Sequence, residues 1–283
     1  MGLKSLLKNL LSEKELEKLP SSFEIIGSRE KAVAIVEIPN ELSKKEKLIA
    51  EAIIKLNKNV KTVLKKISKR KGKFRLRNFK ILLGEKDTEV IHKEYGYFIK
   101  VDPRKVYFSA RESTERQRVA TQVKPNEIVL VMFSGVAPFG IAISKKQPNV
   151  GKVYCIELNK KAHEYAKENV RINKVSHLVV PILGDVKKVC PKFFGKCDRV
   201  IMPLPEEGWK YLELAIKCLK KKGVIHFYFI SDEKEMFKKP LEILEKICKK
   251  LKVNFNLLSK RKVLPYAPRK WKVCLDVKIV KSS

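Results

Sequence analysis

Residues 127–139, EIVLVMFSGVAPF, have the pattern of a turn that binds a cofactor. A run of branched apolar residues, typical of a buried parallel strand, stops abruptly at Ser134-Gly135. A glycine between a strand and a helix lets the backbone approach a ligand that a Cβ atom would keep away. Roughly 20 residues further on, a second strand-like run, VYCIELN, carries Glu157, whose carboxylate can accept hydrogen bonds from ribose hydroxyls. The spacing predicts a nucleoside-cofactor site, and the single glycine favours S-adenosylmethionine over a dinucleotide, whose fingerprint needs three.

Strand-like and helix-like segments alternate along residues 106–283, which predicts a Rossmann-like α/β domain. Such alternation builds a mostly parallel sheet with helices on both faces. The seven predicted strands are residues 127–133, 152–157, 177–183, 198–202, 223–229, 253–260 and 271–280. The predicted helices are residues 138–146, 160–173, 207–221 and 232–250. Because no helix separates the last two strands, we expect a terminal antiparallel strand inserted in the sheet, as in class I methyltransferases.

Residues 1–105 have a different pattern and are predicted to form a smaller α+β domain. The N-terminal MGLKSLLKNLLSEKELEKL has the periodicity of one amphipathic helix packed on its own domain. A second helix is predicted at 43–57, and further strands near 60–67, 74–83, 89–93 and 97–101. The basic run that ends at Lys73 leads into Arg75 and Arg77 on a predicted strand. A lysine-rich run is often no more than a solvated surface, but a basic pair on a strand favours RNA binding.

The charge balance restricts the class of partner. The chain has 63 Lys and Arg against 31 Asp and Glu, a net charge of +32. This excess attracts polyanions, chiefly nucleic acid or an anionic membrane surface. No apolar run reaches the length of a membrane span, and charges interrupt the N-terminal segment too often for a signal sequence. We therefore expect a cytoplasmic protein that does not associate with membranes.

The cysteines and histidines predict neither a disulfide framework nor a metal site. The six cysteines include no C-x-x-C pair, and the four histidines lack the spacing of metal ligands. Most of the cysteines fall on apolar segments and are expected to be small core residues. Cys190 and Cys197 alone lie close enough along the chain to suggest a cross-link.

Nine segments, in a fixed order, resemble the archaeal and eukaryotic-type tRNA (guanine-37-N1)-methyltransferases. They are LPSSFEIIG, VAIVEIP, KEKLIAEAIIK, VKTVLKK, Val106–Arg118, MFSGVAPF, GDV, DRVIMPLP and LPYAP. Each is weak by itself, whereas the ordered set runs from residue 19 to the C-terminus. The resemblance implies an enzyme, expected to be a monomer, that moves a methyl group from S-adenosylmethionine to N1 of guanosine 37 of tRNA. An archaeal branch of the family also methylates C7 of 4-demethylwyosine, the wyosine precursor made from the same guanine.

The resemblance also assigns the catalytic residues. N1 of guanine carries a proton at neutral pH, so a base must remove it, and the negative charge that gathers on O6 then needs a donor. By resemblance, Glu115 is the base and Arg75 is the donor to O6. Each of these roles typically contributes about 10²–10⁴-fold in rate. The alternative for Glu115 is a salt bridge, without a catalytic role, to Arg111, Arg116 or Arg118.

Further site residues are implied in the same way. Those around the methyl donor are Tyr107, Phe133, Val136, Glu157, Leu158, Asp185, Val186 and Pro203. Glu157 is expected to bind the ribose and Asp185 the adenine amino group, although either could instead be a helix cap or a loop carboxylate. Residues expected to contact the tRNA are Lys73, Arg77 and Arg111. Arg77 is also the reserve for the O6 donor.

Two departures from the family pattern leave other functions open. Val131 stands where many members have an acidic residue. The fourth strand commonly ends in Asn-Leu-Pro, with the Asn near the target base, whereas this chain has Pro203-Leu204-Pro205. A proline side chain has neither donor nor acceptor, so other groups must hold the guanine. The alternatives are a wybutosine-pathway transferase that moves the aminocarboxypropyl arm of S-adenosylmethionine to tRNA, and a non-catalytic tRNA-binding protein.

Overall fold

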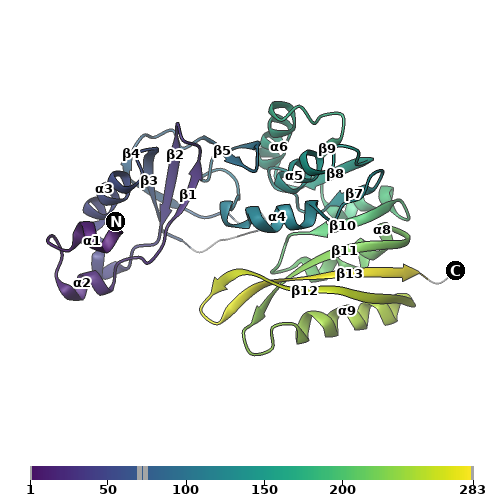
Figure 1. Cartoon of the computed structure of the whole chain (residues 1–283). Coiled ribbons are helices and arrows are strands. Elements are labelled where there is room, and N and C mark those ends of the chain that lie inside the picture. The colour runs from purple at the N-terminus through teal and green to yellow at the C-terminus, as the bar shows by residue number, and fades with distance from the viewer. Residues whose placement is uncertain (1, 69–71, 73–75, 282–283) are drawn as a thin grey trace. The chain divides into compact units, whose positions relative to one another are not determined.

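The structure is a computed structural model that describes residues 2–68, 72 and 76–281. The chain divides into two compact units, Met1–Arg111 and Glu112–Ser283 (Figure 1). The sequence predicts the boundary between residues 105 and 106, six residues before the observed division after Arg111. The segment in between is held by the first unit, because the Ser109 hydroxyl and the Ala110 N–H donate to the Glu24 carboxylate, at 3.1 and 2.9 Å.

The N-terminal unit has a four-stranded sheet in the order β1-β2-β3-β4 and a separate hairpin, β5-β6. The helices are α1 (Leu3–Leu7), α2 (Glu13–Glu17), the 3-10 helix η1 (Asn40–Lys45) and α3 (Glu46–Leu56). The strands are β1 (Glu24–Gly27), β2 (Ala32–Val36), β3 (Val60–Lys66), β4 (Phe79–Gly84), β5 (Val90–Glu94) and β6 (Tyr97–Val101). α3 connects the parallel strands β2 and β3 and buries Ile49 and Ile53, one helical turn apart, against the sheet.

Two local predictions for this unit are wrong. The expected single N-terminal helix is two short helices, because Ser12 starts a new one with a capping box. Its hydroxyl accepts the Glu15 N–H at 3.4 Å, and the Glu15 carboxylate accepts the Ser12 N–H at 2.8 Å. β4 begins at Phe79, so Arg77 precedes the strand rather than lying on it. Lys73 and Arg75 lie outside the described residues.

The C-terminal unit is a seven-stranded sheet with helices, in the strand order β12-β13-β11-β10-β7-β8-β9. Its strands are β7 (Ile128–Val131), β8 (Lys152–Glu157), β9 (Val179–Leu183), β10 (Cys197–Met202), β11 (Leu219–Asp232), β12 (Val253–Ala267) and β13 (Lys270–Lys281). Its α-helices are α4 (Ser113–Ala120), α5 (Pro138–Lys146), α6 (Lys160–Ile172), α7 (Val186–Val189), α8 (Leu212–Cys218) and α9 (Lys238–Leu251). The Rossmann-like α/β prediction is confirmed.

The terminal antiparallel strand is also confirmed. β13 pairs antiparallel with β11 on one side and with β12 on the other, whereas β11, β10, β7, β8 and β9 are parallel neighbours. The predicted helix at 207–221 is too long, because η4 (Gly208–Tyr211) precedes α8 and the chain enters β11 at Leu219. Helix α4 was not predicted at all.

The large core lies between the sheet and its helices and includes residues from β7, β10, β11, β13, α8 and α9. All six cysteines are buried and free, so Cys190 and Cys197 are not cross-linked. Among the described residues, no helix is both long enough and apolar enough to cross a membrane.

Candidate active site

The sheet brings four of the predicted cofactor residues to one edge. Phe133, Glu157, Asp185 and Pro203 lie at or just after the carboxyl ends of β7, β8, β9 and β10, which are adjacent parallel strands in the order β10-β7-β8-β9. The chain runs outward from β7 to β9 and then returns to the other side of β7 as β10. Ligands of open α/β sheets bind outside the carboxyl ends of the strands at such a reversal of strand order.

The loop after β7 has an unusual backbone. Phe133, Gly135 and Ala137 have positive φ angles of 56°, 57° and 64°. Glycine adopts this conformation readily, but the other two residues do so at a cost of order 1–3 kcal/mol each, and such residues cluster at ligand sites. The Ser134 N–H donates to the Ile156 carbonyl at 2.9 Å, and the Gly135 N–H donates to the Glu157 carboxylate at 2.7 Å. These two bonds hold the loop against the end of β8.

Glu157 is held by backbone donors. Its second oxygen accepts the Asn159 N–H at 2.8 Å. Burial raises the pKa of this carboxyl, and the backbone hydrogen bonds from Asn159 and Gly135 offset that effect only in part. Each oxygen keeps an acceptor position for a hydroxyl donor. The neighbouring Ser134 Oγ is buried and has no hydrogen-bond partner among the described residues. An acceptor on β8 and an unsatisfied hydroxyl in the loop that binds it fit the polar ribose of a nucleoside cofactor.

The other predicted cofactor residues differ in exposure. Asp185 caps α7, since its Oδ1 accepts the Lys187 N–H at 2.8 Å, and its Oδ2 is left for a ligand. Val136 and Val186 are buried, Pro203 is half-buried, and Leu158 is 41% exposed.

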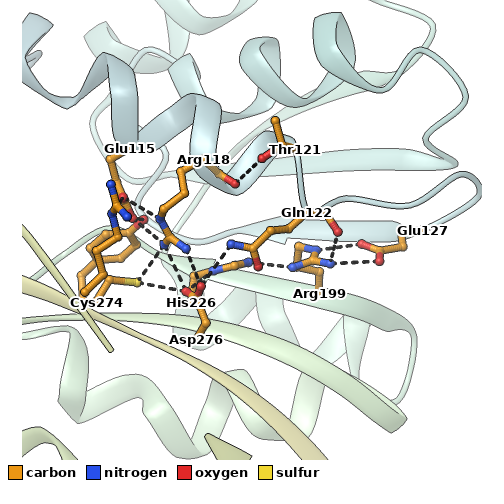
Figure 2. A network of polar contacts seen from close by, with 11 residues as sticks. Glu115, Arg118, Thr121, Gln122, Glu127, Arg199, His226, Cys274 and Asp276 are labelled. Atoms are coloured by element: carbon orange, nitrogen blue, oxygen red, sulfur yellow. Dashed lines mark hydrogen bonds and ion pairs between the residues drawn. The ribbon is translucent and has the colours of Figure 1, made fainter. Parts of the chain in front are cut away.

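Glu115 lies on α4 and is withdrawn from solvent, with 4% of its side chain exposed. It accepts two hydrogen bonds from Arg118, from Nε to Oε2 at 2.8 Å and from Nη2 to Oε1 at 2.7 Å (Figure 2). Tyr228 of β11 donates its hydroxyl to Oε1 at 2.6 Å, and burial raises the pKa of Tyr228 well above its usual value, so this hydroxyl keeps its proton. The salt bridge named in that alternative is therefore present, with Arg118 as the partner, and it fixes the direction of the carboxylate.

Arg118 starts a buried polar chain that crosses the sheet (Figure 2). Both of its terminal nitrogens donate to Asp276 of β13, and Asp276 contacts His226 Nδ1 at 2.7 Å. Arg199 Nη1 lies 2.7 Å from His226 Nε2, and Arg199 also forms a two-bond pair with Glu127 at 2.7 and 3.0 Å. Because a guanidinium can only donate, Nε2 must accept, and Nδ1 carries the hydrogen that it donates to Asp276. His226 is thus neutral, in keeping with the burial that lowers its pKa.

His226, Cys274 and Asp276 are the one group of three potential metal ligands among the described residues, with ligand atoms within 4.8 Å of one another. Hydrogen bonds already engage these atoms. The His226 Nδ1–H is donated to Asp276, and Asp276 accepts from Arg118 at both oxygens. Burial raises the pKa of Cys274 well above its usual value, so its sulfur is a thiol. We therefore interpret the group as a link in the polar chain.

The charged side chains around Glu115 pair with side chains of β13, and the sequence did not predict these pairs. Charged side chains lie at 112, the N-cap of α4, and at 115 and 118 on α4, and polar or charged ones lie at 272, 274 and 276 on β13. Lys272 pairs with Glu112 at 2.7 Å, and Asp276 pairs with Arg118. The signal was the alternation K-V-C-L-D inside an apolar strand, which places three non-aliphatic side chains on one face.

The remaining described site residues lie in the N-terminal unit. Tyr107 and Arg77 are half-buried, and Arg111, in the 3-10 helix η2 (Ala110–Glu112), is exposed.

Comparisons with known proteins agree with this geometry. Residues 90–256 match the model of the TRM5/TYW2 methyltransferase domain, and residues 3–88 match that of the TYW2 N-terminal domain. The tRNA (guanine(37)-N(1))-methyltransferase Trm5b of Pyrococcus abyssi is 41% identical over 92% of this chain and 76% of its own length. The tRNA(Phe) (4-demethylwyosine(37)-C(7)) aminocarboxypropyltransferase of Methanocaldococcus jannaschii is 37% identical over 86% of this chain and 94% of its own length.

Solved structures of the same group are similar throughout the chain. The complex of aTrm5 with tRNALeu has a TM-score of 0.85 and 36% identity, and covers 98% of this chain and 78% of that one. M. jannaschii TYW2 in complex with AdoMet has a TM-score of 0.71 and 31% identity, and covers 92% of this chain and 100% of that one. The matched family model covers more than half of the sequence, and this chain belongs to the TRM5/TYW2 methyltransferase family.

Proposed function

We propose that the protein transfers the methyl group of S-adenosylmethionine to N1 of guanosine 37 of tRNA, as a monomer in the cytoplasm. The observation that carries this proposal is the Glu115 carboxylate. It is buried, fixed by three hydrogen bonds, and joined to Tyr228, whose neighbour Phe227 pairs with Met202, the residue before Pro203. Tyr228, the partner of Glu115, therefore lies in β11 next to the residue opposite the end of β10, which supports a place for Glu115 near the cofactor loops.

Glu115 acts as the general base in this proposal. Arg118 and Tyr228 set the direction of its carboxylate, and one acceptor position on Oε2 is left for the N1–H of guanine. When bound, S-adenosylmethionine supplies a methyl group on a positively charged sulfur. Glu157 holds the ribose, and Oδ2 of Asp185 accepts from the adenine amino group. Arg75 is proposed as the O6 donor with Arg77 in reserve, and Lys73, Arg77 and Arg111 as contacts to tRNA phosphates.

The similarity to aTrm5, which was solved in complex with tRNALeu, supports tRNA as the substrate. The net charge of +32 suits the same polyanion. The proposal includes 4-demethylwyosine, at C7, as a second methyl acceptor at the same nucleotide, since a Saccharolobus solfataricus relative, 36% identical, is named as a tRNA 4-demethylwyosine(37)-methyltransferase.

Aminocarboxypropyl transfer is the second candidate function. It is favoured by the match of residues 3–88 to the TYW2 N-terminal domain. The same sulfonium can lose either its methyl group or its aminocarboxypropyl arm. The by-product is S-adenosylhomocysteine in the first case and methylthioadenosine in the second.

The test is incubation of S-adenosylmethionine with two RNAs, unmodified tRNA and tRNA that carries 4-demethylwyosine at position 37, followed by mass analysis of the nucleosides and the by-product. We expect 1-methylguanosine and S-adenosylhomocysteine from the unmodified tRNA, and no product when guanosine 37 is replaced by adenosine. Methylthioadenosine with a modified 4-demethylwyosine would establish the second candidate instead. Binding of tRNA without any product would leave a tRNA-binding protein.

A further inference from the structure

Three strands present a row of side chains to α4. In the antiparallel register, Tyr228 of β11 lies opposite Cys274 of β13, which lies opposite Arg261 of β12. Directly opposed residues of antiparallel strands point to the same face. Tyr228 hydrogen bonds to Glu115 from one end of the row, and the Arg261 Nε lies 3.7 Å from Glu115 Oε2 at the other end.

The two oxygens of Glu115 are not equally engaged. Oε1 accepts from Tyr228 and from Arg118 Nη2, whereas Oε2 accepts from Arg118 Nε alone among the described residues. A carboxylate has about four acceptor positions, so one remains on Oε2. Arg261 faces that oxygen, but at 3.7 Å it is an ion-pair partner beyond the range of a hydrogen bond.

Exposure shows from which side Glu115 can be reached. The side chains of Glu115 and Arg118 are 4% and 15% exposed, and Tyr228 is fully buried. Arg261 is 49% exposed. Of the three side chains that contact Glu115, Arg261 is thus the one at the solvent boundary, and it stands beside the open acceptor position.

We infer that Arg261 is a further residue of the active site, which donates to O6 of the target guanine, as a second donor beside Arg75, while Glu115 removes the proton from N1; a carbonyl oxygen can accept two such bonds. The inference rests on the proposed function. N1–H and O6 are neighbouring groups on one edge of guanine, a donor beside an acceptor, and Glu115 Oε2 and Arg261 present an acceptor beside a donor. When the N1–H bond breaks, the proton goes to Oε2 and the electron pair stays on the base, where its charge gathers on O6. Arg261, which loses its anionic partner at that moment, follows the negative charge to O6. The N1 lone pair then attacks the methyl carbon, and the electrons of the C–S bond remain on sulfur.

The test is single-turnover methylation at saturating tRNA and S-adenosylmethionine. Arg261→Ala should lower the rate by about 10²-fold, as for removal of one donor to a developing oxyanion. Arg261→Lys, which keeps the charge but not the paired donors, should recover part of the loss. Lys260→Ala is the matched control, because it removes one positive charge from the adjacent exposed position, whose side chain points to the opposite face of β12. It should keep the wild-type rate.

A double variant decides whether Arg261 acts together with Glu115. If it does, Glu115→Gln with Arg261→Ala should be little slower than Glu115→Gln alone, since the two residues act in one step. A wild-type rate for Arg261→Ala, with a loss confined to tRNA affinity, would make Arg261 a phosphate contact and overturn the inference. Fully multiplicative losses in the double variant would also overturn it. If the wild-type protein itself forms no 1-methylguanosine, the proposed function fails, and the role of Arg261 at O6 fails with it.

Discussion

In the same unit, Glu115 is buried and Glu157 is half-buried, and different kinds of donor hold their carboxylates. Glu115 is bound by side chains from other parts of the unit, the Arg118 guanidinium and the Tyr228 hydroxyl. Glu157 is bound by backbone N–H groups of residues close to it in the fold, Gly135 and Asn159. A guanidinium brings a full countercharge, whereas backbone dipoles offset the cost of burial only in part, and the pKa of Glu157 is accordingly raised.

The difference separates two tasks. A carboxylate held by a polar network keeps one direction, as a base that must meet a single proton requires. A carboxylate held by backbone alone remains a strong acceptor for neutral hydroxyls, as ribose binding requires. The following predictions would sharpen this contrast or remove it.

The largest effect is expected for Glu115→Gln. Loss of the base should reduce single-turnover methylation of guanosine by about 10²–10⁴-fold, with little change in the binding of tRNA or cofactor. Glu112→Gln is the matched control, because Glu112 forms a buried pair of the same kind with Lys272 at 2.7 Å, three residues earlier. Equal losses of rate in both variants, or a loss explained by unfolding in a thermal melt, would reduce Glu115 to a structural ion pair.

Asp276→Asn should act on stability. Removing one charge from a buried pair typically costs about 3–5 kcal/mol, so the free energy of unfolding at pH 7 should fall by about that amount. Burial opposes the ionisation of Asp276, but hydrogen bonds from His226 and Arg118 outweigh it and hold the pKa of Asp276 far below its ordinary 3.8. Its contribution to stability is therefore present above pH 3.8 and lost as the pH falls below it. Urea unfolding of wild type and variant at pH 7 and near pH 3 checks both points, and a difference in stability independent of pH would contradict the charged pair.

Glu157→Ala should weaken the binding of S-adenosylhomocysteine by about 1.5–3 kcal/mol, measured by calorimetry, because ribose hydroxyls lose a charged acceptor. In the wild type, affinity should decline as the pH falls towards the raised pKa of Glu157, and so begin its decline above the ordinary 4.5 of a glutamate. Glu164→Gln, on the exposed face of α6, should change neither the affinity nor its pH dependence. Full affinity in Glu157→Ala would show that Glu157 holds the Gly135 loop but does not bind the cofactor.

The smallest effect is expected for Glu213→Gln. Glu213 bridges Lys217 and Lys250 at 2.8 and 2.7 Å on the surface, and these bonds lower its pKa to about 2. Because the group is solvated, the loss of stability should be at most about 1 kcal/mol and should vanish at high salt. A loss as large as that of Asp276→Asn would show that burial is not what separates the two kinds of pair.

Much of the C-terminal unit could be predicted because its signals are local. Short contiguous segments predict three of its features. These are the Gly135 turn, the position of Glu157 at the end of its strand, and the inserted β13. A strand buried on both faces has an apolar run, and a turn after it has a glycine, whatever the rest of the chain does. The prediction of a single N-terminal helix is wrong for a local reason too, because the capping box at Ser12 starts a second helix.

Helix α4 and its partners could not be found in this way. A surface helix is predicted from a stripe of apolar residues, whereas the buried residues of α4 include Glu115 and Arg116 beside Val119 and Ala120. Charged side chains can face inward only where opposite charges and donors meet them, and those of α4 are met from β11 and β13, more than 100 residues away in the sequence. The sequence by itself determined the sheet, the cofactor turn and the residue types of the site. Which carboxylate faces which cation was decided by the tertiary structure alone, because the energy of a buried charge depends on its neighbours in space.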